Sequence, residues 1–275
     1  MHEPVSAAVM AALAPHGRLR AAINMSNFLL VSGKDEKGAP DGVSPDLAKA
    51  IAARLGVPCE LIAYEGPGQL GDDVGADIWD IGNIAIEPER AQTIDFTQSY
   101  VHIDANFMVR KSAPYLRNED INKENVEIIL YNRSAYDLWL TDNFTAPTYI
   151  RVASIGESHA EFHAGRADVL ASLKPKLIEE IDTSDAYRII EHPFTAIRQA
   201  VGIAKDQPEA VAFINNIISE LLKNGEIATR LRAHNVDKKL TLPDKDSEPE
   251  KKVFLKGWFP EMIWNRHHLA KKTNK

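Results

Sequence analysis

The chain has 275 residues, enough for one large domain or for two lobes with separate cores. Its 44% hydrophobic and 26% charged residues are ordinary for a soluble globular protein. The formal net charge of −7 argues against a nucleic-acid partner, because phosphate binding requires a basic face. The single cysteine, Cys59, excludes an internal disulfide, and its apolar surroundings predict a buried, unreactive thiol.

The N-terminal residues 1–14 predict a separate short surface helix. A secretory signal needs basic residues followed by a longer apolar run, whereas the only early side-chain charge here is Glu3. No stretch of the sequence is long enough to span a bilayer, so we expect no membrane insertion. We therefore expect a periplasmic protein if a signal peptide has been removed, and a cytoplasmic one otherwise.

Strands and helices are expected to alternate along the chain, which favours an α/β layer fold. The expected strands are short apolar runs at residues 19–23, 60–64, 78–86, 94–100, 126–131 and 168–172. The expected helices follow the 3.6-residue period and cover residues 44–55, 134–140, 158–164 and 206–231. Ser44 is expected to cap the first of these helices and Gly56 to end it. A turn is expected at residues 66–68, and a helix break at Gly225.

Two extended segments, residues 105–110 and 194–204, are predicted to cross between two lobes. Two crossovers between the same lobes form a hinge, so each lobe is discontinuous in sequence. We expect lobe 1 to comprise residues 15–108 and 196–240, and lobe 2 to comprise residues 109–195.

The C-terminal residues 241–275 differ in composition from the rest of the chain. A charged, proline-containing linker precedes an aromatic cluster, which consists of Phe254, Trp258, Phe259 and Trp264. We expect this cluster to dock on the protein's own body and the protein to be a monomer. Self-association or a partner contact through the cluster is the alternative, because exposed aromatic clusters rarely stay solvated.

The most informative segment runs from residue 77 to residue 100. Small residues in an apolar run, namely Gly82, Asn83 and Ala85, are expected to leave backbone amides approachable, and Arg90 follows after a turn. Exposed amides beside a guanidinium fork suit a carboxylate.

In its order of motifs the chain resembles the family 3 solute-binding proteins, the extracytoplasmic receptors of polar amino-acid ABC importers. The matching segments, spread over residues 17–236, are an opening strand at 17–24, a first helix at 42–57, short motifs at 79–80, 88–90 and 95–97, and second-half motifs at 134–138 and 165–168. The resemblance implies a two-lobed periplasmic-binding-protein-like fold of type II. It also implies a ligand cleft between lobes joined by two crossover strands.

The resemblance implies a carboxylate site built from both lobes. Arg90 matches the arginine that holds the ligand's α-carboxylate, and Ser134 matches the hydroxyl residue at a helix start in the other lobe. Asn83 and Ala85 occupy positions where the family often has hydroxyl residues, so Ala85 can offer only its backbone amide. The helix that Ser134 caps can add its N-terminus to the clamp.

Four further residues are candidates to cover the ligand. Asn24, Asn27 and Phe28 follow the first strand in a loop that supplies such contacts in the family. Tyr64 stands at the end of its strand and is expected to line the same cleft. Ordinary turn and surface roles are the alternative for all four residues.

Two positions depart from the family pattern. Arg133 replaces the usual glycine before the helix, where it would block the pocket or add a second cation for a dicarboxylate, unless it is merely exposed to solvent. Leu173 replaces the acidic residue that usually binds the α-ammonium group. A buried ammonium without an anionic partner is costly, so either the ligand lacks this group or another acid replaces the missing one.

We therefore expect a binding protein without catalysis, which closes on a small carboxylate solute, amino-acid-like or an organic acid, and serves an ABC permease. A sensory or interaction module on the same fold is the first alternative. A dehydratase like the cyclohexadienyl dehydratases is the second, weak because its proton-transfer acid should fall near Leu173. The scattered histidines and the absence of phosphate-loop motifs predict no metal and no cofactor.

Overall fold

The computed structural model describes residues 4–243, so the predicted aromatic cluster lies outside the described residues. The helices are α1 (Ala7–Leu13), α2 (Val43–Leu55), α3 (Pro67–Asp72), α4 (Ala135–Asn143), α5 (Ile155–His163), α6 (Lys174–Ile181), α7 (Pro208–Lys223) and α8 (Glu226–Ala233). The strands are β1 (Leu19–Asn24), β2 (Gly33–Lys34), β3 (Pro40–Asp41), β4 (Cys59–Tyr64), β5 (Ile81–Ala85), β6 (Ile94–Phe96), β7 (Val101–Arg110), β8 (Glu127–Tyr131), β9 (Thr148–Val152), β10 (Val169–Leu173), β11 (Tyr187–Ile189) and β12 (Thr195–Ala204). Arg90–Gln92 and Asn118–Asp120 form short 3₁₀ helices.

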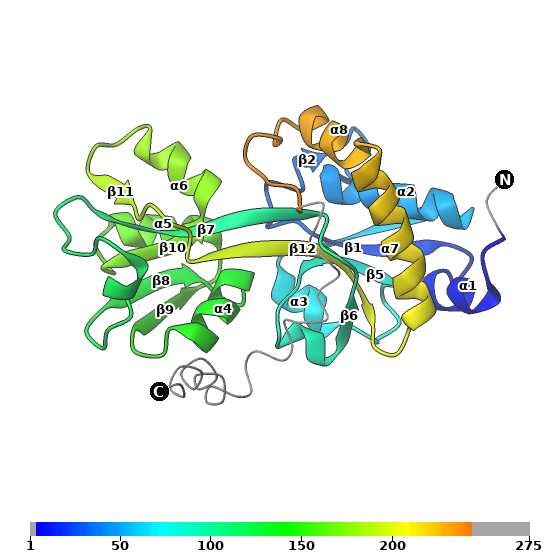
Figure 1. The fold of residues 1–275 in the computed structure, drawn as a ribbon, viewed down its shortest axis with the longest axis horizontal. Helices are drawn as coiled ribbons and strands as arrows, with labels where there is room; N and C mark the ends of the chain where they lie inside the picture. Colours follow the sequence, from blue (N-terminus) through cyan, green and yellow to red (C-terminus); the bar gives the residue numbers. More distant parts are fainter. Residues whose placement is uncertain (1–3, 244–275) are drawn as a thin grey trace, which may run out of the picture. The chain divides into compact units, whose positions relative to one another are not determined.

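Two groups of elements are joined by the long strands β7 and β12 (Figure 1). One group, lobe 1, contains β1 to β6, α1 to α3, α7 and α8, and the other, lobe 2, contains β8 to β11 and α4 to α6. The mixed α/β, two-lobed fold expected from the sequence is therefore confirmed. The residue boundaries expected for the lobes stay predictions.

Strand order explains how the crossovers work. The strands pair in the order β4-β1-β5-β12-β7-β10-β8-β9, while β6 pairs with β12 and β11 with β7. β7 and β12 lie antiparallel, with Ile103 opposite Ile197. β12 continues into lobe 1 beside β5, and β7 continues into lobe 2 beside β10. The hinge is therefore a hydrogen-bonded two-strand ribbon and not a pair of separate linkers.

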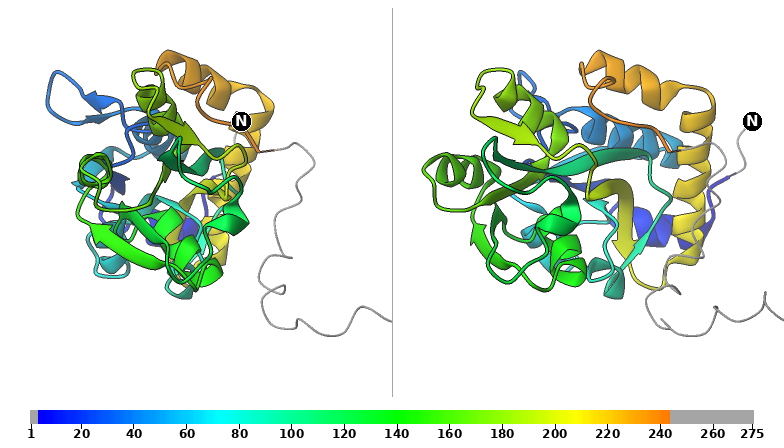
Figure 2. Two further views of the ribbon diagram at one scale, coloured as in Figure 1. Left: turned by 90° about the vertical axis from the view of Figure 1, so that its left-hand side faces the viewer. Right: turned by 60° about the vertical axis from the view of Figure 1, so that its left-hand side comes forward.

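Apolar burial holds each lobe together. In lobe 1, α2 packs its buried face, which includes Leu47 and Ile51, against the sheet, and α7 packs beside α1 and α8 (Figure 2). In lobe 2, α5 and α6 cover a cluster around Phe162 and Leu177. Each such fully buried Leu, Ile or Phe contributes about 1.5–3 kcal/mol relative to an exposed one.

Several predicted element ends shift for identifiable reasons. The first long helix begins at Val43 with Gly42 as its N-cap, so the prediction that Ser44 caps it is wrong. The Ser44 hydroxyl is instead buried 3.1 Å from the Tyr100 hydroxyl. Residues 66–68 were expected to form a turn but begin helix α3, because Pro67 suits a first helical turn.

Glycine positions ended two helices as expected. Gly56 is left-handed, with φ 74°, and closes α2. Gly225, with φ 80°, separates α7 from α8 at the predicted break. Both positions require a backbone conformation that side-chain-bearing residues rarely adopt.

A buried ion pair fixes the approach to β5. The Arg20 guanidinium donates to the Asp80 carboxylate at 2.7 Å, and the Arg20 backbone amide donates to the same carboxylate at 2.7 Å. Both residues are buried, and the hydrogen bonds to Asp80 raise the pKa of Arg20. The pair ties β1 to the segment that leads into β5 and so determines where Ala85 and Arg90 emerge.

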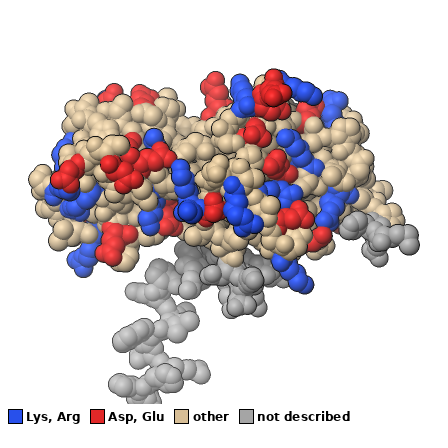
Figure 3. All heavy atoms as spheres, turned by 90° about the horizontal axis from the view of Figure 1, so that it is seen from above, with Lys and Arg blue, Asp and Glu red and all other residues tan. Residues whose placement is uncertain are grey.

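Charged side chains of both signs lie on the surface of the protein (Figure 3). Acidic and basic side chains are interspersed on the face shown in Figure 3. None of the helices within residues 4–243 has the length and apolar character needed to cross a bilayer.

Cys59 is partly buried, and burial raises the pKa of its thiol to about 11, so the thiol stays protonated at neutral pH.

Gly42 provides a test of this packing. Its φ is 146°, and a Cβ there would lie 2.4 Å from the Leu30 carbonyl oxygen and 2.7 Å from the Val31 Cα. We expect Gly42→Ala to lower the free energy of unfolding by about 2–3 kcal/mol, because backbone atoms must move. Urea unfolding would measure this loss.

Gly71→Ala is the matched control. A Cβ at Gly71, in α3, meets nothing within 4 Å, and alanine favours a helix by about 0.5–1 kcal/mol over glycine. Equal stability changes in the two variants would contradict the proposed close approach at Gly42.

Candidate functional site

An inner cavity of about 40 Å³ lies where the two lobes face each other. It is lined by the ends of strands and the starts of helices, with the residues Asn24, Ser26, Asn27, Pro67, Ala85, Arg90, Tyr131, Ser134, Ala135, Tyr136, Ile155, Leu173, Ile197 and Gln199. An outer cavity of about 570 Å³ shares three of these residues, Ser26, Tyr131 and Ile155. The inner cavity therefore adjoins the outer cavity at these three residues.

Among the described residues that line the inner cavity, Arg90 is the only charged one. Its guanidinium donates to the Ala85 carbonyl and to the Arg133 carbonyl, each at 3.1 Å. The side chain is buried, and within residues 4–243 it pairs with no carboxylate. Burial lowers the pKa of Arg90 to about 10, so the group remains a cation at neutral pH. The inner cavity thus faces a buried positive charge that Glu87 and Glu89 offset only in part and without a salt bridge.

The start of α4 faces the same cavity. The Ser134 hydroxyl accepts from the Asp137 amide at 3.1 Å, and the Asp137 carboxylate accepts from the Arg133 amide at 2.7 Å. These bonds complete the N-terminal cap of α4. The backbone amides of Ala135 and Tyr136 lie in the first turn and therefore have no hydrogen-bond acceptor within the helix. They are available to an anion.

Two buried polar atoms belong to cavity-lining residues and have no hydrogen-bond partner within residues 4–243. They are the Asn27 side-chain oxygen and the Tyr136 hydroxyl. Such atoms normally have a partner, because an unsatisfied buried polar group costs about 1–3 kcal/mol. Burial raises the pKa of Tyr136, whereas the Ser134 and Ser172 hydroxyls, which lie near the Tyr136 hydroxyl, act to lower it, so the Asn27 oxygen is the atom that lacks a polar partner in this cavity.

Leu173 is buried at the end of β10 and lines the inner cavity. The neighbouring Lys174 ammonium pairs with the Asp104 carboxylate at 3.3 Å. None of the described residues that line the inner cavity is an Asp or a Glu. The alternative that another acid replaces the missing one therefore finds no support in this wall.

Arg133 has a left-handed backbone, with φ 56°, at the position where the family usually has glycine. Its guanidinium makes two bonds to the Asp72 carboxylate, at 2.8 and 2.6 Å, across to lobe 1. It stacks close to Gly68, where a Cβ would lie 3.0 Å from the guanidinium carbon. Because Asp72 neutralises this cation, the dicarboxylate expectation loses its main support.

Of the remaining candidate ligand-binding residues, some line a cavity and one does not. Asn24 and Asn27 line the inner cavity, and Phe28 lines the outer one, as does Arg133. Tyr64 lines none of the cavities described here and instead donates to the Asp73 carboxylate at 2.7 Å.

The expected free amides at Gly82 and Asn83 are not available. Both residues lie inside β5 and pair with β1 on one side and β12 on the other, so their amides belong to the sheet. A Cβ at Gly82 would meet Leu70 at 2.9 Å in the lobe's interior. Only Ala85, at the end of the strand, reaches the cavity.

Sequence reasoning missed part of the cavity wall. The additional residues include Tyr131, Tyr136, Ile155, Ile197 and Gln199. Tyr131 ends a predicted strand, Tyr136 lies at the start of a predicted helix, and Ile197 and Gln199 lie on a predicted crossover strand, so their positions were the available signal. Ile155 lies three residues before the predicted start of its helix, so no predicted element contained it.

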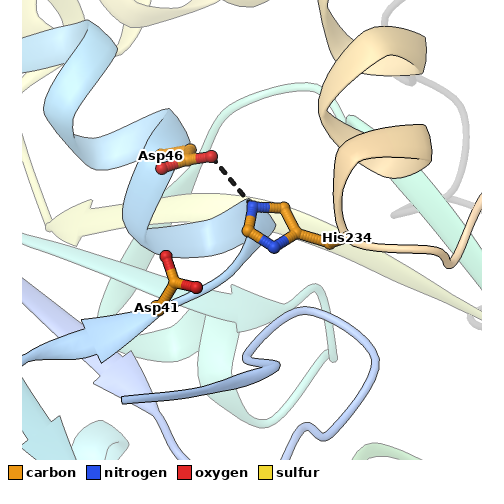
Figure 4. Close-up of side chains that lie close together, drawn as sticks. All are labelled: Asp41, Asp46 and His234. Carbon is orange, nitrogen blue, oxygen red and sulfur yellow. Dashed lines mark hydrogen bonds and ion pairs between the residues drawn. The ribbon is translucent and has the colours of Figure 1, made fainter. Parts of the chain in front are cut away.

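A second cluster of polar side chains lies away from the cavity. The Asp46 carboxylate and the His234 Nε2 are 2.9 Å apart, the His234 Nδ1 lies 3.1 Å from the Ser32 hydroxyl, and Asp41 is adjacent (Figure 4). The donor atoms of Asp41, Asp46 and His234 lie within 4.8 Å of one another. Since both ring nitrogens already have protein partners, the cluster is explained as a link between α8 and α2.

Comparisons with known proteins agree with this architecture. The family model described as bacterial extracellular solute-binding proteins, family 3, matches residues 20–235. No curated relative matches the sequence.

Solved structures show the same fold. An amino acid ABC transporter substrate-binding protein from Streptococcus pneumoniae bound to L-arginine is 21% identical, with a TM-score of 0.67 over 83% of this chain and 98% of that one. A mutant of ArgBP from T. maritima is 19% identical, with a TM-score of 0.67 over 82% and 99%. AncCDT-1, described as an ancestral amino acid-binding protein and a precursor of cyclohexadienyl dehydratase, is 22% identical, with a TM-score of 0.67 over 82% and 97%.

Two lobes, a two-strand hinge and a cationic cavity between the lobes define the class of two-lobed solute-binding proteins. Within that class, the chain belongs to the bacterial extracellular solute-binding proteins, family 3. The family and the neighbouring structures are mostly binding proteins of amino-acid ABC transporters.

Glu87, buried near Arg90, gives a pH-dependent prediction. Burial raises the pKa of its carboxyl from 4.5 to about 7, although Arg90 and Arg198 oppose the rise. Because the folded state holds this proton more tightly than the unfolded state, the associated stability is fully present below pH 4.5 and is lost as pH rises through about 7. We expect the free energy of unfolding of Glu87→Gln to vary with pH by up to about 3 kcal/mol less than that of the wild type.

Urea unfolding between pH 4 and 9 would measure the effect. Glu89→Gln is the matched control, because Glu89 is exposed and lies two residues away. Identical pH profiles for the wild type and Glu87→Gln would refute the raised pKa.

Proposed function

We propose that this protein binds a small carboxylate solute without an α-ammonium group between its lobes and delivers it to an ABC permease. The observation that carries the proposal is the buried guanidinium of Arg90 at the inner cavity, which has no carboxylate partner within residues 4–243. An uncompensated buried charge is expensive, so a ligand anion would supply the missing partner.

Groups from both lobes would converge on that anion. Arg90 comes from lobe 1, and the amides of Ala135 and Tyr136 come from the start of α4 in lobe 2. Charge-assisted hydrogen bonds of this kind are among the strongest in proteins. A ligand that contacts both lobes favours the closed arrangement over the open one, which is the population shift that a hinge protein requires.

The excluded ammonium follows from the cavity wall. An α-amino acid would place its ammonium close to its carboxylate, and the described wall of the inner cavity contains no Asp or Glu to neutralise it. The same composition weakens the dehydratase alternative, since a general acid has no candidate there. The delivery step rests on the family and on the transporter proteins among the similar structures.

The anchor is tested with Arg90→Ala and a panel of 2-oxo acids. Losing charge-assisted hydrogen bonds of about 1.5–3 kcal/mol should weaken binding about 10- to 150-fold in calorimetry. Arg18→Ala is the control, because Arg18 forms only an exposed pair with Glu60. Unchanged affinity in Arg90→Ala would remove the anchor assignment.

The exclusion of an ammonium group is tested with matched pairs of ligands. We expect 2-oxo acids to raise the melting temperature more than the amino acids of the same carbon skeleton, because a ligand that binds only the native state stabilises it. Leu173→Asp should reverse this order by supplying the missing anion. A wild-type preference for the amino acids would overturn this part of the proposal.

A further inference from the structure

Two glycines of lobe 1 lie directly against lobe 2. Gly66 is the N-cap of α3, and Gly68 lies in the first turn of that helix. They face Tyr131, which ends β8, and Arg133, which precedes the N-cap of α4. A Cβ at Gly68 would lie 3.0 Å from the Arg133 guanidinium carbon, and a Cβ at Gly66 would overlap the Tyr131 hydroxyl. Lobe 2 therefore occupies the space that side chains would fill at the start of α3.

The backbone conformation of Gly66 does not require glycine. Its φ of −155° and ψ of 165° are extended angles that any residue adopts. Apart from the two chain neighbours, the described atoms within 4 Å of an added Cβ all belong to Tyr131. At Gly82 and Gly202, by contrast, an added Cβ would meet side chains of lobe 1 itself. An alanine at position 66 would therefore fit lobe 1 and clash only with lobe 2.

The overlap involves a single atom of Tyr131. The hydroxyl oxygen is the nearest atom to the added Cβ, whereas the ring carbon Cζ would lie 3.4 Å away, an ordinary van der Waals distance. The Tyr131 side chain also lines both the inner and the outer cavity, and Gly66 lines the outer one. The place where Tyr131 meets the opposite lobe is therefore beside the junction of the two cavities.

We propose that Gly66 and Tyr131 form a closure contact, and that the lobes can close on a ligand only because residue 66 has no side chain. The Tyr131 hydroxyl occupies the space left by the missing Cβ. The ring then lies between the inner cavity, where Arg90 binds the carboxylate, and the outer cavity. The contact consists of protein atoms alone, so it goes beyond the proposed function, on which only the choice of probe rests.

Calorimetry of the full chain with pyruvate and 2-oxobutanoate tests the contact. We expect Gly66→Ala to bind these probes about 5- to 150-fold more weakly, the range for forcing a methyl group into a packed contact. The double variant Gly66→Ala/Tyr131→Phe lacks the overlapping oxygen and should bind within about twofold of Tyr131→Phe alone. Gly71→Ala is the control in the same helix, because a Cβ there meets nothing within 4 Å.

The distance between the lobes gives a readout that does not depend on ligand affinity. Spin labels on Lys37→Cys in lobe 1 and Glu124→Cys in lobe 2, both exposed positions, report this distance in a Cys59→Ala background. We expect the wild type to have a short-distance population, with or without the probes. Gly66→Ala should lose this population, and Gly66→Ala/Tyr131→Phe should regain it.

Three results would overturn the closure contact. They are equal short-distance populations in Gly66→Ala and the wild type, no recovery in the double variant, and no short-distance population in the wild type under any condition. Failure of the proposed function looks different. If the wild type binds neither probe but Gly66→Ala alone lacks the short-distance population, the contact stands and the carboxylate site fails.

Discussion

The buried guanidinium of Arg90 is the constraint on which the cleft depends. Arg90 stands at the start of the 3₁₀ helix Arg90–Gln92, which follows β5 in lobe 1, and one of its two hydrogen bonds reaches the Arg133 carbonyl in lobe 2. Both acceptors are neutral carbonyls, so these hydrogen bonds orient the charge, and Glu87 and Glu89 offset it only in part and without a salt bridge. The fold holds a cation in place, away from water, and leaves an anion from outside to complete it.

Several features of the fold serve to position this cation. The Arg20–Asp80 pair determines how the chain enters β5, and the pairing of β5 with β1 and β12 determines where it leaves. Nearby, Glu87 is driven toward its neutral form by burial, which limits its ability to neutralise Arg90. The Arg133 carbonyl that accepts a hydrogen bond from Arg90 belongs to a residue with a strained, left-handed backbone.

The sequence was sufficient for the fold class and for most strands, whereas the roles of the site residues stay predictions. Periodicity and glycine positions identified α2, α7 and the break at Gly225, and Arg90 and Ser134 were placed in the cleft by motif order. The free amides at Gly82 and Asn83 were a wrong prediction, since small residues indicate close approach but not which neighbour approaches. In this chain the neighbours are two strands and a leucine.

The side chains that complete the cavity were harder to predict because they depend on tertiary geometry. Gln199 and Ile197 lie on a crossover strand whose position relative to β5 is set by antiparallel register, which is not visible in a single sequence. The partner of Arg133 is equally non-local. Asp72 is distant from Arg133 in the sequence, and no sequence pattern distinguishes it. Only the fold shows that its carboxylate pairs with the Arg133 guanidinium.

The Arg133–Asp72 pair has a consequence for kinetics. It joins the lobes without using the ligand, so it lowers the free energy of the closed form whether or not the cavity is filled. A receptor biased in this way loses less of its binding energy to closing, and its apparent affinity rises accordingly. The same bias slows opening, which lengthens the residence time of a bound solute. Because the Arg133 and Asp72 side chains are 44% and 58% exposed, water screens the pair, and this bias toward the closed form amounts to about 0–1 kcal/mol.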